Sequence, residues 1–102
     1  MKTEHNITRY TFFKKLSFLP FVEKIILFGS RARKDNFDRS DIDLAIDCPN
    51  ATIKEWLIII DIVDNADTLL PIDCIRYDKL SSDSLLKKQI DQNAIILYEK
   101  MR

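Results

Sequence analysis

The chain contains a single glycine, Gly29, among its 102 residues. A domain of this size and average composition would contain about seven. Because glycine alone adopts left-handed backbone conformations at no steric cost, this position is one where a Cβ atom is not tolerated. Gly29 follows the apolar segment 22–28, which predicts a buried strand, and it precedes Ser30. The sequence therefore predicts a sharp turn at the end of a strand.

Helical and strand patterns alternate along the rest of the chain. Strands are predicted over 22–28, 41–47, 71–76 and 95–98. Helices are predicted over 7–18, at the start of 31–39, from 53 to about 65 with Thr52 as N-cap, and over 82–93. We therefore expect one domain, 1–102, of the α/β (α+β two-layer) class. Its small mixed sheet should carry helices on one, apolar face and acidic residues on the other.

Asp41 and Asp43 are candidate metal ligands. Side chains alternate along a strand, so the two carboxylates share a face, with Cα atoms ~7 Å apart. Asp73, in the strand 71–76, is the candidate for a third carboxylate within cross-strand reach. Three carboxylates this close raise each other's pKa unless divalent metal neutralises them. Two Mg²⁺ ions ~3.5–4 Å apart would bind all three and hold the attacking and leaving oxygens of an in-line displacement.

The segment after Gly29 has the groups that bind phosphate. Ser30 offers a hydroxyl and lies at the start of a predicted helix, where backbone amides favour anions. Arg31 and Arg33 follow, and their guanidinium groups could neutralise a triphosphate or a departing pyrophosphate. Taken singly, these features are explained as a plain turn, two solvated acids and surface arginines. Their combination favours a site for nucleotidyl transfer.

The chain resembles the minimal nucleotidyltransferases (MNT) of the DNA polymerase β superfamily. The resemblance spans nearly the whole chain and is carried by Phe28-Gly29-Ser30-Arg31-Ala32-Arg33, a gap of ten residues after Ser30, and Ser40-Asp41-Ile42-Asp43-Leu44-Ala45-Ile46. It implies a polymerase β-like core in which Asp41 and Asp43 bind metal and Gly29-Ser30 holds the nucleotide phosphates. It also implies that Asp73 is the third carboxylate and helps to deprotonate the attacking hydroxyl. Lys34 departs from the pattern, because glycine is frequent at that position.

Stand-alone MNT proteins resemble the antitoxins of two-gene toxin–antitoxin pairs, whose partner is a helical HEPN-domain RNase. That likeness implies Mg²⁺-dependent transfer of AMP from ATP to a tyrosine hydroxyl of the partner, which silences the RNase. Sequence physics alone supports nucleotidyl transfer to some hydroxyl. Two alternatives stay open: a non-catalytic antitoxin that masks its partner, and a transferase acting on a small molecule. Since the chain is too short for a second domain, we expect a partner to supply the acceptor, in a hetero- or homo-oligomer.

Composition argues against several other functions. Sixteen basic residues balance sixteen acidic ones, so no extensive nucleic-acid footprint is expected. No uncharged run exceeds seven residues, far short of the ~20 apolar residues of a membrane span, so we expect a cytoplasmic protein. Cys48, Cys74 and His5 lack metal-site spacing, and the cysteines are expected to be buried free thiols.

The predicted helix from residue 53 has more apolar residues than one core face needs. Two stripes are recognisable, Ile53/Trp56/Leu57/Ile60 and Ile58/Ile59/Ile62. One stripe suffices for the core of the domain. The other is either a second core contact or an exposed patch for another protein.

Overall fold

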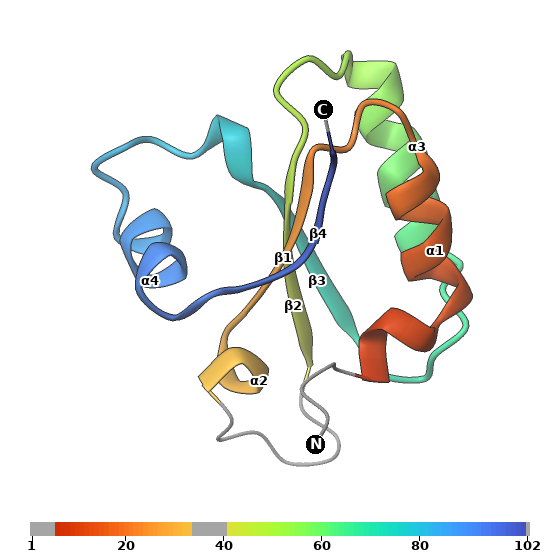
Figure 1. The fold of residues 1–102 in the computed structure, drawn as a ribbon, viewed down its shortest axis with the longest axis horizontal. Coiled ribbons are helices and arrows are strands. Elements are labelled where there is room, and N and C mark those ends of the chain that lie inside the picture. The colour runs from red at the N-terminus through yellow and green to blue at the C-terminus, as the bar shows by residue number, and fades with distance from the viewer. Residues whose placement is uncertain (1–5, 34–40, 102) are drawn as a thin grey trace.

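The structure is a computed structural model that describes residues 6–33 and 41–101. A four-stranded sheet forms its centre, with the order β3-β2-β1-β4 (Figure 1). The strands are β1 (Lys24–Phe28), β2 (Ile42–Asp47), β3 (Ile72–Arg76) and β4 (Ile95–Glu99). β1 runs antiparallel to both β2 and β4, whereas β2 and β3 are parallel. The sheet is therefore mixed, as predicted.

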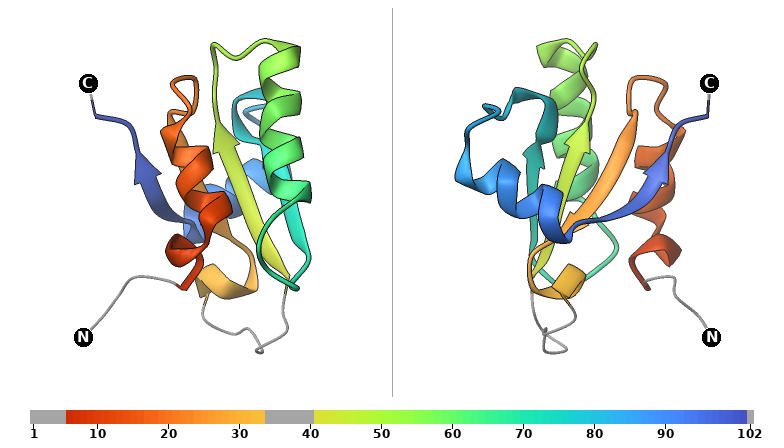
Figure 2. Two further views of the ribbon diagram at one scale, coloured as in Figure 1. Left: turned by 90° about the vertical axis from the view of Figure 1, so that its right-hand side faces the viewer. Right: turned by 60° about the vertical axis from the view of Figure 1, so that its left-hand side comes forward.

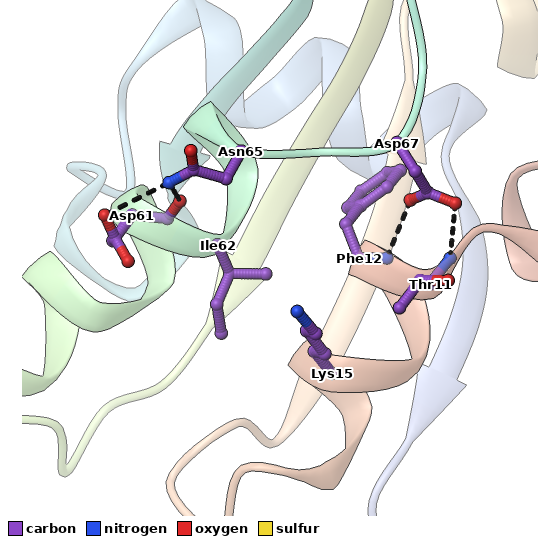
Figure 3. A pocket seen from close by; sticks show the side chains of 7 residues that line it. All are labelled: Thr11, Phe12, Lys15, Asp61, Ile62, Asn65 and Asp67. Carbon is purple, nitrogen blue, oxygen red and sulfur yellow. Dashed lines mark hydrogen bonds between the residues drawn. The ribbon is translucent and has the colours of Figure 1, made fainter.

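One face of the sheet is covered by α1 (Thr11–Phe18) and α3 (Ile53–Asp64), which lie side by side over it (Figure 2). Alternate strand residues point into this layer, so Ile42, Leu44 and Ile46 are fully buried. The predicted helix 7–18 is divided in two, because a 3₁₀ helix, η1 (Asn6–Arg9), precedes α1. The Asp67 carboxylate accepts hydrogen bonds from the backbone N–H groups of Thr11 and Phe12, at 3.0 and 3.1 Å (Figure 3). Those bonds satisfy the first turn of α1.

The opposite face of the sheet carries a helix as well as the acids, so the prediction of helices on only one face was wrong. A fourth helix, α4 (Leu85–Asn93), lies on that side with the short 3₁₀ helix η2 (Tyr77–Lys79) (Figure 1). Ile90 of α4 is buried against Ile26 and Ala45, which point away from α1 and α3. Burying the apolar side chains of this second face from water is favourable, and the small side chain of Ala45 allows a helix to approach closely. α4 starts three residues later than predicted, with the Ser84 hydroxyl accepting from the Lys87 N–H.

Helix α3 begins where the sequence predicts. The Thr52 hydroxyl accepts the Glu55 N–H, and the Glu55 carboxylate accepts the Thr52 N–H, which together form a capping box. The two predicted stripes, however, do not separate into core and surface. Ile59 and Val63 are buried and Trp56 and Ile62 pack half-buried on the core, whereas three residues drawn from both stripes are exposed: Ile53, Leu57 and Ile58.

Arg76, at the end of β3, ties this strand to the end of β2. Its guanidinium donates to the carbonyl oxygens of Cys48 and Ala51, at 3.0 and 2.9 Å, and pairs with Asp78 at 3.0 Å. Asp78 in turn accepts the Cys48 N–H at 2.9 Å. Both charged side chains are nearly buried, at 11% and 10% exposure. The cluster therefore fixes how β3 lies beside β2.

The two cysteines are free thiols, as predicted; Cys48 is buried and Cys74 half-buried. Burial raises the pKa of each thiol to about 12, so neither is suited to act as a nucleophile at neutral pH. Among the described residues, none of the helices combines the length and apolar character that a membrane crossing requires.

Candidate active site

The strands bring the predicted acidic residues to one end of the sheet. Asp43 of β2 and Asp73 of β3 are directly paired Cα positions in the parallel ladder, so their side chains project from the same face. Asp41 lies one residue before β2 begins and two residues before Asp43, so the alternation of an extended chain would put its side chain on the same face. Asp41 and Asp73 are exposed, and Asp43 is half-buried. The three carboxylates are thus neighbours that remain open to an incoming substrate.

Gly29 lies directly against Asp43. The residue before it, Phe28, is the paired position of Asp43 in the antiparallel β1–β2 ladder. The φ angle of Gly29 is +78°, a conformation that L side chains rarely adopt. A Cβ atom here would also overlap the Asp43 Oδ2 atom and lie 3.0 Å from Cγ. The site therefore needs glycine for two reasons, the sign of φ and the approach of a carboxylate to the backbone.

The turn at Gly29 leads straight into a one-turn helix, α2 (Ser30–Arg33). The N–H groups of Ala32 and Arg33 donate to the Gly29 carbonyl oxygen, both at 3.1 Å. Arg31 Nε donates to the backbone oxygen of Asp41 at 3.3 Å. This bond joins the Gly-Ser segment to the first of the acids, and the sequence carried no signal of it. Lys34 and His5 lie outside the described residues.

The electrostatic environment of Asp43 is unfavourable for a carboxylate. Burial raises the pKa of Asp43 above 3.8, and the negative charges of Asp73 and Asp41 raise it further. Arg33 and Arg31 lower it, but their effect is smaller. The two arginines therefore compensate the acids only in part. A positive charge bound between the carboxylates would stabilise the ionised site.

The donor set fits a hard divalent cation such as Mg²⁺, which binds carboxylate oxygens. Within residues 6–33 and 41–101, no three His, Cys, Asp or Glu side chains converge closely enough to form a metal cage. Asp41, Asp43 and Asp73 are the residues that could hold such a cation.

The mixed sheet, the paired acids Asp43 and Asp73 and the glycine turn against Asp43 agree with the fold and site that the resemblance to polymerase β-like nucleotidyltransferases implies. The sequence matches the family described as "Polymerase beta, Nucleotidyltransferase" over residues 12–102. The chain belongs to this family, which confirms both the predicted fold class and the resemblance to polymerase β-like nucleotidyltransferases.

The solved structures that share the fold include two of a toxin–antitoxin. One is a toxin–antitoxin complex with AMP-PNP, 20% identical, with a TM-score of 0.64 over 87% of this chain and 72% of that one. The other is a mutant of the toxin–antitoxin complex MntA–HpeT, also 20% identical, with a TM-score of 0.59 over 85% of this chain and 70% of that one. No curated protein matches the chain.

Proposed function

We propose that the protein is a Mg²⁺-dependent nucleotidyltransferase that moves AMP from ATP to a hydroxyl of a partner protein. The acceptor is a tyrosine of a HEPN-type toxin, so that the chain acts as an antitoxin and protein adenylyltransferase. The observation that carries the proposal is the approach of the Gly29 backbone to Asp43, which is itself paired with Asp73. Further support comes from the family match and from two structural neighbours that are toxin–antitoxin complexes, one of them with AMP-PNP.

Each residue has a role in this proposal. Ser30 and the backbone around Gly29 hold the phosphates, and Arg31 and Arg33 neutralise their charge. Asp41, Asp43 and Asp73 would hold two Mg²⁺ ions, whose chemistry is to polarise the α-phosphate and stabilise the leaving oxygen. This distribution places the anionic substrate between cations on one side and metal-binding acids on the other.

In the reaction itself, the acceptor oxygen forms a bond to the α-phosphorus while the bond to the bridging oxygen breaks. Pyrophosphate leaves with that electron pair, and the proton of the hydroxyl passes to the carboxylate of Asp73. Asp73 suits this role because it is exposed and lies on β3, the last strand of the sheet at that edge. A large acceptor can therefore reach it from outside.

A direct test incubates the protein with a purified partner, Mg²⁺ and ATP labelled at either the α- or the γ-phosphate. The partner to test is the product of the adjacent gene, provided that this gene encodes a small helical protein with an Arg and a His separated by about four to six residues, as expected of a HEPN RNase. We expect label on the partner from the α-phosphate only, and none when EDTA removes the metal. Asp41→Asn and Asp43→Asn should abolish labelling.

Asp47→Asn is the matched control, because Asp47 lies on the same strand and face as Asp43 but at the other end of β2. It should leave labelling intact. If the partner stays unlabelled yet is inhibited, the result would favour the non-catalytic antitoxin that masks its partner over the enzyme. Labelling of a small hydroxylated molecule, and not of the partner, would favour the small-molecule alternative.

A further inference from the structure

Helix α4 lies on the face of the sheet that carries the acids, between η2 and α2 (Figure 1, Figure 2). Its buried residue Ile90 is the one that points to the sheet. One flank of the helix is occupied, because Lys87 Nζ donates to the Tyr77 hydroxyl at 2.8 Å and this hydroxyl donates to Asp91 at 2.7 Å. Tyr77 belongs to η2, which follows the end of β3 that is farther from the acids. The second flank of α4 therefore faces the end of the sheet where the acids lie.

Two amide side chains, those of Gln89 and Asn93, belong to this second flank. With about 3.6 residues per turn, both fall on the side of Ile90 opposite to Lys87 and Asp91. Their spacing of four residues places them next to each other on the helix surface. Both are exposed, and within the described part of the chain neither amide group forms a hydrogen bond. These donors and acceptors are thus open to a ligand at the acid end of the sheet.

An aromatic ring lies between this flank of α4 and the acids. Phe28 is the paired position of Asp43 in the β1–β2 ladder, so its side chain projects from the same face as that carboxylate. The ring packs at the border of the apolar cluster beneath α4 and stays half-buried. After α4 the chain returns to this point, because Ile95 pairs with Leu27, the neighbour of Phe28. The last residue of α4, Asn93, is therefore brought toward the ring.

An aromatic ring with amide groups beside it has the chemistry that recognises a nucleobase. The ring can stack on the flat face of any base. An amide offers an N–H donor and a carbonyl acceptor, which match the N7 acceptor and the amino donor on the edge of adenine. Guanine presents two acceptors at the same edge, so the carbonyl of an amide would face another acceptor there. Side chains of this kind favour adenine over guanine.

We propose that Phe28, Gln89 and Asn93 form the nucleobase subsite of the candidate active site and select adenine. The Phe28 ring stacks on the base, and the two amides of α4 bond to its edge. This inference deepens the proposed function and rests on it for one element, the position of the α-phosphate beside Asp43. The base of the same nucleotide then lies over the ring of the residue paired with Asp43.

The test measures binding of ATP, GTP and inorganic tripolyphosphate to the full chain with Mg²⁺, so that no acceptor protein is needed. The wild type should bind ATP about tenfold more tightly than GTP. Gln89→Ala and Asn93→Ala should each weaken ATP binding by about fivefold or more, with tripolyphosphate binding unchanged. Gln92→Ala is the matched control and should bind ATP like the wild type, because Gln92 is exposed on the same helix but points away from the sheet.

Two further substitutions separate stacking from recognition of the edge. Phe28→Leu should weaken ATP and GTP binding by a similar factor, since stacking does not depend on the base. Gln89→Arg presents two donors and should shift the preference toward GTP. Thermal melts verify that each variant is folded. Equal affinity of the wild type for ATP and GTP would overturn the subsite, as would an unchanged ratio of the two affinities when Gln89→Ala and Asn93→Ala are combined.

The subsite and the proposed function can fail separately. Selective binding of ATP without any labelling of the partner would leave the subsite in place and remove the transferase activity. Transfer of label to the partner at equal rates from ATP and GTP, each labelled at the α-phosphate, would keep the activity and contradict the subsite.

Discussion

Replacing Gly29 by alanine tests the geometry of the site most sharply. An L residue in the left-handed region costs about 1–2 kcal/mol. The new Cβ also overlaps the Asp43 carboxylate, whose end must rotate away, and an off-rotamer side chain costs about 0.5–1.5 kcal/mol. The two contributions sum to about 1.5–3.5 kcal/mol. In a domain of this size, the melting temperature should fall by at least about 6 °C.

The two contributions can be separated by repeating the substitution in an Asp43→Ala background. Without the carboxylate only the backbone strain remains, so Gly29→Ala should then cost about 1–2 kcal/mol. The difference, about 0.5–1.5 kcal/mol, is the coupling between the two positions. Urea unfolding of the four proteins, without metal or nucleotide, measures each free energy. Equal costs in both backgrounds, or a cost below about 0.5 kcal/mol in the wild type, would refute the contact.

Three further outcomes follow from the described contacts. Without metal, Asp43→Asn should be more stable than the wild type at neutral pH, as measured by thermal melts. Because burial and the other acids raise the pKa of Asp43 above 3.8, this advantage should shrink as the pH falls through that pKa. Asp67→Ala should lower the melting temperature without affecting nucleotide binding. Since the α1 amides lower the pKa of Asp67, this loss of stability should be full above pH 3.8 and vanish in stronger acid. Arg76→Met leaves Asp78 buried without its cation and should cost about 3–5 kcal/mol in urea unfolding, whereas Arg76→Met combined with Asp78→Leu should cost less.

The sequence predicted the strand positions well because they depend on local alternation. Ile42, Leu44 and Ile46 alternate with polar positions and are fully buried, as the period of a strand requires. The glycine turn and the Asp-x-Asp pair are also local features, and the structure places them together. Pairing of Asp73 with Asp43 was inferred from their common face, and the parallel register bears out that placement. The catalytic roles of these residues remain predictions.

Features that depend on packing between distant segments were less predictable. Nothing in the alternation of β2 shows that Ala45, on the face of the acids, is covered by Ile90 of a helix more than forty residues later. The helical wheel of α3 contains enough apolar residues for two faces, so only the position of the sheet decides that Ile59 is core and Leu57 is surface. The bond from Arg31 to the Asp41 backbone likewise depends on how the chain returns after α2.

The most direct test of the central claim is the intact mass of the partner after incubation with the protein, ATP and Mg²⁺. The account predicts a gain of one or more AMP units on the partner, located on a tyrosine by fragmentation, with an equal release of pyrophosphate. The gain should vanish with Asp43→Asn and persist with Asp47→Asn. An unchanged partner mass in the presence of a stable complex would contradict nucleotidyl transfer as the function of this site.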